Sequence, residues 1–298
     1  MKRTAISVAI LSLSIGAAAQ TYGQGTTQNP PAAGQSSPSG QAPPAQAPPP
    51  GGKRPPQAKT QPEFDAYKVV AANTDPAAME KGADDFATKF PDSEVRLLLY
   101  KTAMRMYQTA NNPDKTEAMG RKVLALDGDD PEALLTVSEL IAEKTRDTDL
   151  DRDQHFADAV KMSQKALQTI DTDISVPAGT PQEKLDAYKS SLRSQAYSIL
   201  GTIEYNKNNY PVAQENLQKS LDALPSQPDS VVVLRLALSL DKQSKYPEAL
   251  KVANRAVELT QETTQIGTLA RRERDRLQQL TGGTASPPAQ PQAEPPKN

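Results

Sequence analysis

Residue types that build many active sites are missing, or nearly so, from this chain of 298 residues. It has no cysteine, no tryptophan and one histidine, His155, and aromatic residues make up only 4% of it. The lack of cysteine excludes disulfides, thiolate nucleophiles and cysteine-ligated zinc or iron–sulfur sites. A single histidine excludes any site that needs two imidazoles. An enzyme is therefore the function class with the least support, and we expect no catalytic residue and no cofactor.

Proline is abundant but unevenly distributed. Of the 26 prolines, eleven lie in residues 30–62 and five in residues 287–296, which leaves ten for residues 63–282. Stretches rich in Pro, Gln, Ala, Gly and Ser have too little apolar surface to offset the entropy of ordering, and they favour extended conformations. We therefore predict a disordered linker at residues 20–62 and a disordered tail at residues 282–298. Both are interpreted as spacers, with docking into an aromatic groove as the alternative.

The first residues have the pattern of a cleaved secretory signal at residues 1–19. Lys2 and Arg3 precede a charge-free apolar run, and Ala17 and Ala19 give the small-x-small pattern before a cut. The run is shorter than the roughly 20 apolar residues of a membrane span. We therefore expect a secreted or periplasmic protein without a transmembrane span in its mature chain.

The charge balance of the mature chain is mildly acidic. Removal of the signal leaves 32 basic and 36 acidic residues, a formal net charge of −4. A protein with this balance has no general attraction to nucleic acids or to anionic membranes. We therefore expect protein or peptide partners and no nucleic acid.

An internal repeat runs through the middle of the chain, whose composition favours helix. NNYPVA and SKYPEA occupy equivalent places, with Ala213 and Ala249 36 residues apart. Further copies are DPEALLTVSELI with HFADAVKMSQKAL, and LLLYKTAMRMY with RKVLALDGDDPEAL. This pattern resembles the tetratricopeptide repeat (TPR), a helix–turn–helix unit of about 34 residues.

The resemblance rests on the apolar stripe of each first helix and on small residues in each second helix. The stripes are Tyr100, Ala103, Met104, Tyr107; Leu134, Val137, Ser138, Ile141; Tyr197, Leu200, Gly201, Glu204; and Val233, Leu236, Ala237, Leu240. The small residues are Ala159 and Ala166, Ala213 and Ser220, and Ala249 and Ala256, where the first copy has Thr116 and Val123. The resemblance implies an all-α, right-handed α-solenoid of about five TPR-like helix pairs over residues 63–281.

Local signals predict two further features of this array. Thr180 and Glu183 form a capping box that starts a long helix. A final helix at residues 264–280 caps the solenoid, with Ile266, Leu269, Leu277 and Leu280 facing inward and RRERDR facing outward.

The first helices of a TPR array line a concave groove that suits an extended peptide or a partner's helix. The resemblance places these residues on it: Lys101, Arg105, Gln108, Glu139, Glu143, Ser198, Thr202, Tyr205, Asn206, Leu234 and Leu238. Their character changes from basic to acidic, then to neutral and apolar, and the acidic residues contradict a clamp for a C-terminal carboxylate. The hypothesis is a non-catalytic interaction scaffold or adaptor in the bacterial cell envelope. A self-associating structural factor is the alternative.

An Asp-rich insertion is the one candidate for a metal site. Asp147, Asp149, Asp151, Asp153 and Asp158 take the odd and twelfth places of an EF-hand calcium loop. The glycine of that loop is replaced by Arg152, and its final glutamate by an aspartate. A solvated loop is the favoured interpretation, and a calcium-modulated binding module is the weaker one. His155 nearby is interpreted as a surface residue, because no nucleophile motif accompanies it.

Overall fold

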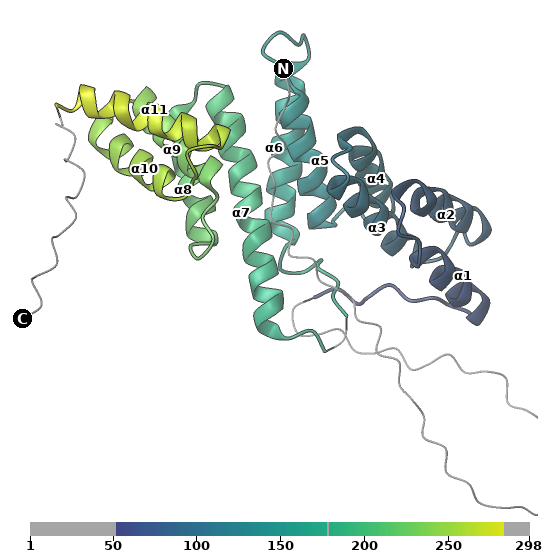
Figure 1. Cartoon of the computed structure of the whole chain (residues 1–298). Coiled ribbons are helices and arrows are strands. Elements are labelled where there is room, and N and C mark those ends of the chain that lie inside the picture. Colours follow the sequence, from purple (N-terminus) through teal and green to yellow (C-terminus); the bar gives the residue numbers. More distant parts are fainter. Residues whose placement is uncertain (1–51, 178, 283–298) are drawn as a thin grey trace, which may run out of the picture. The chain divides into compact units, whose positions relative to one another are not determined.

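The computed structural model describes residues 52–177 and 179–282, which form eleven α-helices in chain order (Figure 1). The helices are α1 (Gln61–Ala71), α2 (Pro76–Lys89), α3 (Arg96–Thr109), α4 (Pro113–Leu126), α5 (Pro131–Lys144), α6 (Arg152–Thr169), α7 (Gln182–Asn206), α8 (Tyr210–Ala223), α9 (Ser230–Lys242), α10 (Tyr246–Glu258) and α11 (Gln265–Leu280). The predicted signal, most of the predicted linker and the predicted tail beyond Gly282 lie outside these residues. Within them, no helix combines the length and apolar character that a membrane crossing requires.

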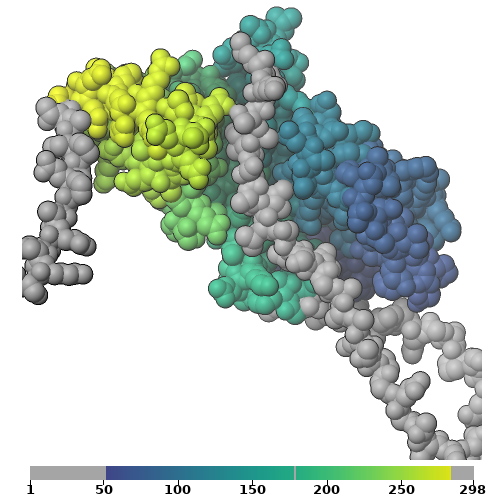
Figure 2. Space-filling model, in the orientation of Figure 1, coloured from purple at the N-terminus to yellow at the C-terminus, as the bar shows by residue number. Residues whose placement is uncertain are grey.

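Each helix packs against the next one along the chain, from α1 with α2 to α10 with α11. The first helices of neighbouring pairs also contact each other, as in α5 with α7 and α7 with α9, and α11 packs on both α9 and α10. The described residues therefore form five helix pairs and a capping helix, which confirms the predicted all-α solenoid. The capping helix lies at the surface of this array (Figure 2).

Proline positions set where the helices begin. Pro76, Pro113 and Pro131 are each the first residue of a helix, where the missing N–H would have had no partner within the helix. The residue before each proline is an aspartate or asparagine whose side chain accepts a hydrogen bond from a backbone N–H of the first turn. The ten prolines of residues 63–282 all lie in the first turn of a helix, at its cap or between helices.

The predicted capping box at α7 is wrong. Pro181 is the N-cap residue, and no side chain caps the helix. The hydroxyl of Thr180 instead donates a hydrogen bond to the carbonyl of Pro177 at 2.7 Å. The Thr180 hydroxyl, which the sequence pattern predicts as a helix cap, therefore forms its hydrogen bond within the preceding turn. The predicted length is confirmed, because α7 has 25 residues.

The predicted orientation of α11 is correct only in part. Leu277 is fully buried, but Leu269 and Leu280 are 43% and 50% exposed. Ala270 and Glu273 take the inward positions, and the Glu273 carboxylate is paired with Arg276, which also pairs with Asp241 of α9. Residues spaced by four, three and four positions lie on one face of a helix. Several sets of residues in α11 have this spacing, so the sequence does not decide which set faces inward.

Residues 52–60, which the sequence analysis assigned to the linker, lie against the helical array, and α1 begins two residues before the predicted boundary. The Lys53 ammonium group is 2.7 Å from the Asp127 carboxylate at the end of α4. The Arg54 guanidinium donates to both carboxylate oxygens of Glu94, at 2.8 Å each. We call residues 52–60 the strap. Its charged residues pair with the array, and Ala58 packs partly against the core.

Charge reversal should detach the strap. Lys53→Glu/Arg54→Glu places carboxylates against Asp127 and Glu94, and like charges in contact repel. The Lys53 N–H donates to the Ile174 carbonyl at 3.1 Å, so its amide hydrogen should exchange about tenfold faster in the variant.

Native-state hydrogen exchange measures this effect. The matched control, Lys161→Glu/Lys251→Glu, makes the same change in net charge at exposed helix positions. If the amide hydrogen of residue 53 exchanges at the same rate in the test variant and in the control, the ion pairs do not hold the strap.

Candidate partner-binding face

The basic residues of the predicted groove, Lys101 and Arg105, are paired with carboxylates of the same chain. The Lys101 ammonium lies 2.6 Å from Asp130 and 3.1 Å from Glu132, and the Arg105 guanidinium donates to both oxygens of Glu132 at 2.5 and 2.6 Å. Asp130 and Glu132 stand at the start of α5, so these pairs join α3 to the next first helix. Tyr188 of α7 adds a hydrogen bond to Glu132 at 3.1 Å.

The pKa values of this cluster reflect the mutual pairing. Burial alone would raise the pKa of Glu132, but the charges of Lys101 and Arg105 outweigh it and lower the pKa to about 2. Burial likewise opposes the charge of Lys101, yet Glu132 and Asp130 raise its pKa. Both cations are therefore engaged by the fold, and they do not form the free basic surface that the sequence suggested.

The acidic residues of α5 are in a different situation. The Glu139 carboxylate is partly buried and accepts one hydrogen bond, from the Gln195 amide of α7 at 2.8 Å. Burial raises the pKa of Glu139 to about 7, and the nearby charges of Glu143 and Asp229 act in the same direction. Glu143 is an exposed residue, but neighbouring protein atoms remove some water from its carboxylate, and this partial desolvation raises its pKa as well. Among the described residues, neither carboxylate forms an ion pair.

Arg235 of α9 carries the next charge along this surface. Its guanidinium donates to the Thr202 hydroxyl at 2.8 Å, and that hydroxyl donates to the Ser198 carbonyl at 2.8 Å. Burial lowers the pKa of Arg235, against the opposing effect of Asp229, Tyr205 and Glu143. Thr202 and Ser198 were predicted groove residues; Thr202 contacts this cation directly, and Ser198 is linked to it through Thr202.

The remaining predicted residues occupy several environments. Leu234 is buried in the core formed by α8 to α11, and Leu238 packs partly against that core. The Tyr205 ring meets the Tyr210 ring edge-on, with centroids 5.5 Å apart. The Asn206 carbonyl accepts a hydrogen bond from Arg152 at 2.7 Å, and Gln108 is partly buried on α3. The predicted apolar end of the groove is thus largely core.

The structure therefore assembles a surface that we call the α5–α7–α9 face, made by Glu139 and Glu143, Gln195 and Thr202, and Arg235. Gln195 and Arg235 are not among the groove residues that the repeat pattern predicts. Arg235 lies one residue after Leu234, and a polar residue in the otherwise apolar run of α9 was the available signal. Gln195 had no signal, because its role depends on Glu139, which lies 56 positions away.

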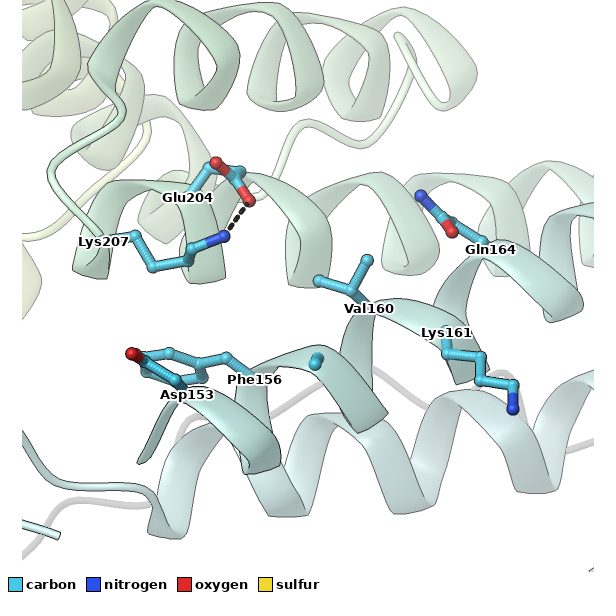
Figure 3. Close-up of a pocket in the computed structure, with 8 residues that line it drawn as sticks. Asp153, Phe156, Val160, Lys161, Gln164, Glu204 and Lys207 are labelled. Atoms are coloured by element: carbon cyan, nitrogen blue, oxygen red, sulfur yellow. Dashed lines mark hydrogen bonds and ion pairs between the residues drawn. The ribbon is translucent and has the colours of Figure 1, made fainter. Parts of the chain in front are cut away.

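A hollow of about 510 Å³ lies between α6 and the end of α7 (Figure 3). Phe156 and Val160 give it apolar lining, and Asp153, Lys161, Gln164, Glu204 and Lys207 add polar groups. Glu204 and Lys207 already pair with each other at 3.1 Å. Of the predicted site residues, Asp153 alone lines the hollow, so it is separate from the α5–α7–α9 face.

The Asp-rich insertion makes contacts of its own. Asp149 accepts a hydrogen bond from the Arg146 N–H at 2.8 Å, and Asp147 pairs with Arg152 at 3.2 Å. Asp151 lies 3.1 Å from the His155 imidazole. The described residues contain no group of three or more His, Cys, Asp or Glu placed to hold a metal ion. The structure thus adds no support to the calcium hypothesis, and His155 lies in the first turn of α6 with its side chain 42% exposed.

Close contact between paired helices at small residues decides the fold family. Ala213 and Ala249 are fully buried at equivalent places in α8 and α10. A Cβ atom on Gly201 would lie only 2.7 Å from the Leu217 Cγ of the paired helix. This approach is the one that the repeat pattern requires. The array has the tetratricopeptide-repeat fold.

No protein-family model matches the chain, and no curated protein matches it. Three solved structures show similar TPR arrangements. MamA is 15% identical, with 66% of this chain and 88% of that chain covered and a TM-score of 0.45. YrrB, a TPR protein with an unusual peptide-binding site, is 14% identical, with 68% and 87% covered and a TM-score of 0.45. PilF of Pseudomonas aeruginosa is 16% identical, with 74% and 93% covered and a TM-score of 0.46.

Proposed function

We propose that this protein is a non-catalytic interaction scaffold or adaptor of the bacterial cell envelope that binds a peptide or protein segment. The observation that supports this proposal is the lateral connection of the first helices by polar side chains. Arg105 meets Glu132, Gln195 meets Glu139, and Arg235 meets Thr202, so α3, α5, α7 and α9 present one continuous polar face. An ordered, polar face on a rigid array suits a bound partner segment.

Site-specific photocrosslinking tests the binding face. A photoreactive phenylalanine replaces Ser198 on this face, or the exposed Gln168 on α6 as a matched control, in cells that make the protein. The Ser198 position should yield discrete protein adducts, and the Gln168 position should not. Adducts from Gln168 only would move the partner to another surface and contradict the proposal.

The envelope assignment has its own support and test. It rests on the signal pattern at residues 1–19, which lies outside the described residues. The mature protein should be recovered from the periplasmic or extracellular fraction, and its N-terminal sequence should begin at Gln20. A cytoplasmic protein that keeps Met1 would contradict the assignment.

Self-association is a second candidate, and the two end helices favour it. Phe64 and Val69 on α1 are 44% and 74% exposed, and α11 exposes Leu269 and Leu280. Apolar side chains at both ends of an array can join one copy to the next. Light scattering at micromolar concentration separates the candidates, because a monomer supports the adaptor and a discrete oligomer supports the structural factor.

A further inference from the structure

The α5–α7–α9 face keeps charges of both signs without pairing them. Glu139 and Glu143 are four residues apart on one helix, a spacing at which like charges repel and destabilise the helix. Among the described residues, Glu143 has no hydrogen bond or ion pair, and Glu139 has only the Gln195 amide. Lys101 and Arg105 on α3, by contrast, are fully paired with carboxylates of α5. This part of the array therefore leaves two neighbouring carboxylates of one helix without an ion pair among the described residues.

Arg235 does not relieve these acids, although it is near them. Its charge opposes the upward shift that partial desolvation gives to the pKa of Glu143, so the two groups interact through space, but they form no ion pair. α7 packs between their helices, and Thr202 of α7 fixes the guanidinium by a hydrogen bond. Gln195, about two helical turns before Thr202 on α7, holds the Glu139 carboxylate in the same way. The fold thus holds the guanidinium and the Glu139 carboxylate on neutral hydrogen-bond partners, and the charge of Asp229 acts on Arg235 without forming an ion pair.

We propose that this face binds a partner segment of mixed charge, with a Lys or Arg side chain between Glu139 and Glu143 and an acidic side chain on Arg235. This inference rests on the proposed function and specifies the chemistry of the partner. Charge complementarity favours a partner of mixed charge. A nucleic acid would be repelled by the acidic pair, and a purely basic peptide would be repelled by Arg235. Side chains partly removed from water give stronger charge pairing than freely exposed ones.

Selection from a display library of random twelve-residue peptides tests the inference. The target is the full mature chain, as wild type, as Glu139→Gln/Glu143→Gln or as Arg235→Gln, and the matched control is Glu248→Gln/Glu258→Gln on α10. Wild type and control should select peptides enriched in both Lys/Arg and Asp/Glu. The acid-pair variant should lose the Lys/Arg enrichment, and Arg235→Gln should lose the Asp/Glu enrichment. Unchanged circular dichroism shows that each variant is folded.

One selected, histidine-free peptide then provides a quantitative test. Its dissociation constant should rise at least tenfold in the acid-pair variant. For wild type, affinity should fall about tenfold from pH 8 to pH 6, because a carboxyl with a pKa near 7 takes up a proton and stops attracting the cation. The groups that face Glu139 are Glu143, Gln195 and Asp229, and Arg235 acts on Glu143. Glu139→Gln should remove this pH dependence.

The outcomes separate this inference from the proposed function. Binders whose Lys/Arg and Asp/Glu content is the same for wild type and both face variants would overturn the inference and leave peptide binding in place. A flat pH profile for wild type would also overturn it. A library that returns no binder to wild type would overturn both proposals.

Discussion

Replacing Glu132 by alanine should lower the free energy of unfolding by about 2 kcal/mol, one of the largest effects of any single charge in this array. The change leaves Lys101 and Arg105 without their shared carboxylate and removes the Tyr188 hydrogen bond. Lys101 and Glu132 are only 16% and 15% exposed, so water cannot fully replace the lost partner. Arg105 is 44% exposed, which places the effect below that of a fully buried pair.

Urea unfolding followed by circular dichroism measures the change. The matched control is Glu248→Ala, which also removes a glutamate from the first turn of a helix but one that is exposed. Equal losses for the two variants would mean that only the helix-dipole interaction was removed, and that the cluster contributes nothing.

The pH dependence of this cluster appears when the stabilities of wild type and Glu132→Ala are compared at several pH values. The pKa of Glu132 is lowered from 4.5 to about 2, so its ion pairs stabilise the folded state above pH 4.5. This contribution disappears as the pH falls from 4.5 toward 2. Glu132→Ala should therefore lose less stability over that interval than wild type does.

Replacing Gly201 by valine should cost about 3 kcal/mol, because α7 and α8 approach each other at this glycine. Its Cβ would lie 2.7 Å from the Leu217 Cγ and 3.1 Å from the Leu217 backbone nitrogen. The side chain of Leu217 could rotate, but the backbone nitrogen moves only if the helix does. The two helices would have to separate in the middle of the array.

Thermal unfolding of Gly201→Val against Ala187→Val isolates the packing effect. Ala187 is an exposed position of the same helix, so it reports the cost of a β-branched residue in α7 without a close neighbour. The Gly201 variant should unfold several degrees below the control. Equal melting temperatures would show that the helices tolerate a larger separation than the geometry indicates.

The helix pairs could be predicted because their signals are local. Prolines at helix starts, the period of the apolar stripes and small residues such as Ala213 and Ala249 all repeat within one unit of the array. The α11 helix was harder, since Ala270 and Glu273 fit an inward stripe as well as Leu269 does. The strap was missed, because its composition predicts disorder and its contacts are with residues far along the chain, such as Asp127, Glu94 and Ile174.

The candidate site was predicted in outline only. Lys101 and Arg105 were placed on the right helix, but their partners lie 27 to 31 positions away, where a pattern of residue types gives no information on pairing. Nothing in the sequence shows that Glu139 and Glu143 differ from Lys101 and Arg105 in whether they are paired. Only their neighbours in space distinguish the two sets.

The order of residues along the chain was enough to specify helices, their pairing and a family of folds, because hydrophobic periodicity and close-packing positions act over a few residues. It also excluded cysteine chemistry and any site built on two histidines. Which charges remain open to a partner was settled by tertiary packing alone. Ion pairs form between side chains that the fold brings together from different repeats. Among the described residues, those contacts engage Lys101 and Arg105 but leave Glu139, Glu143 and Arg235 without an ion pair.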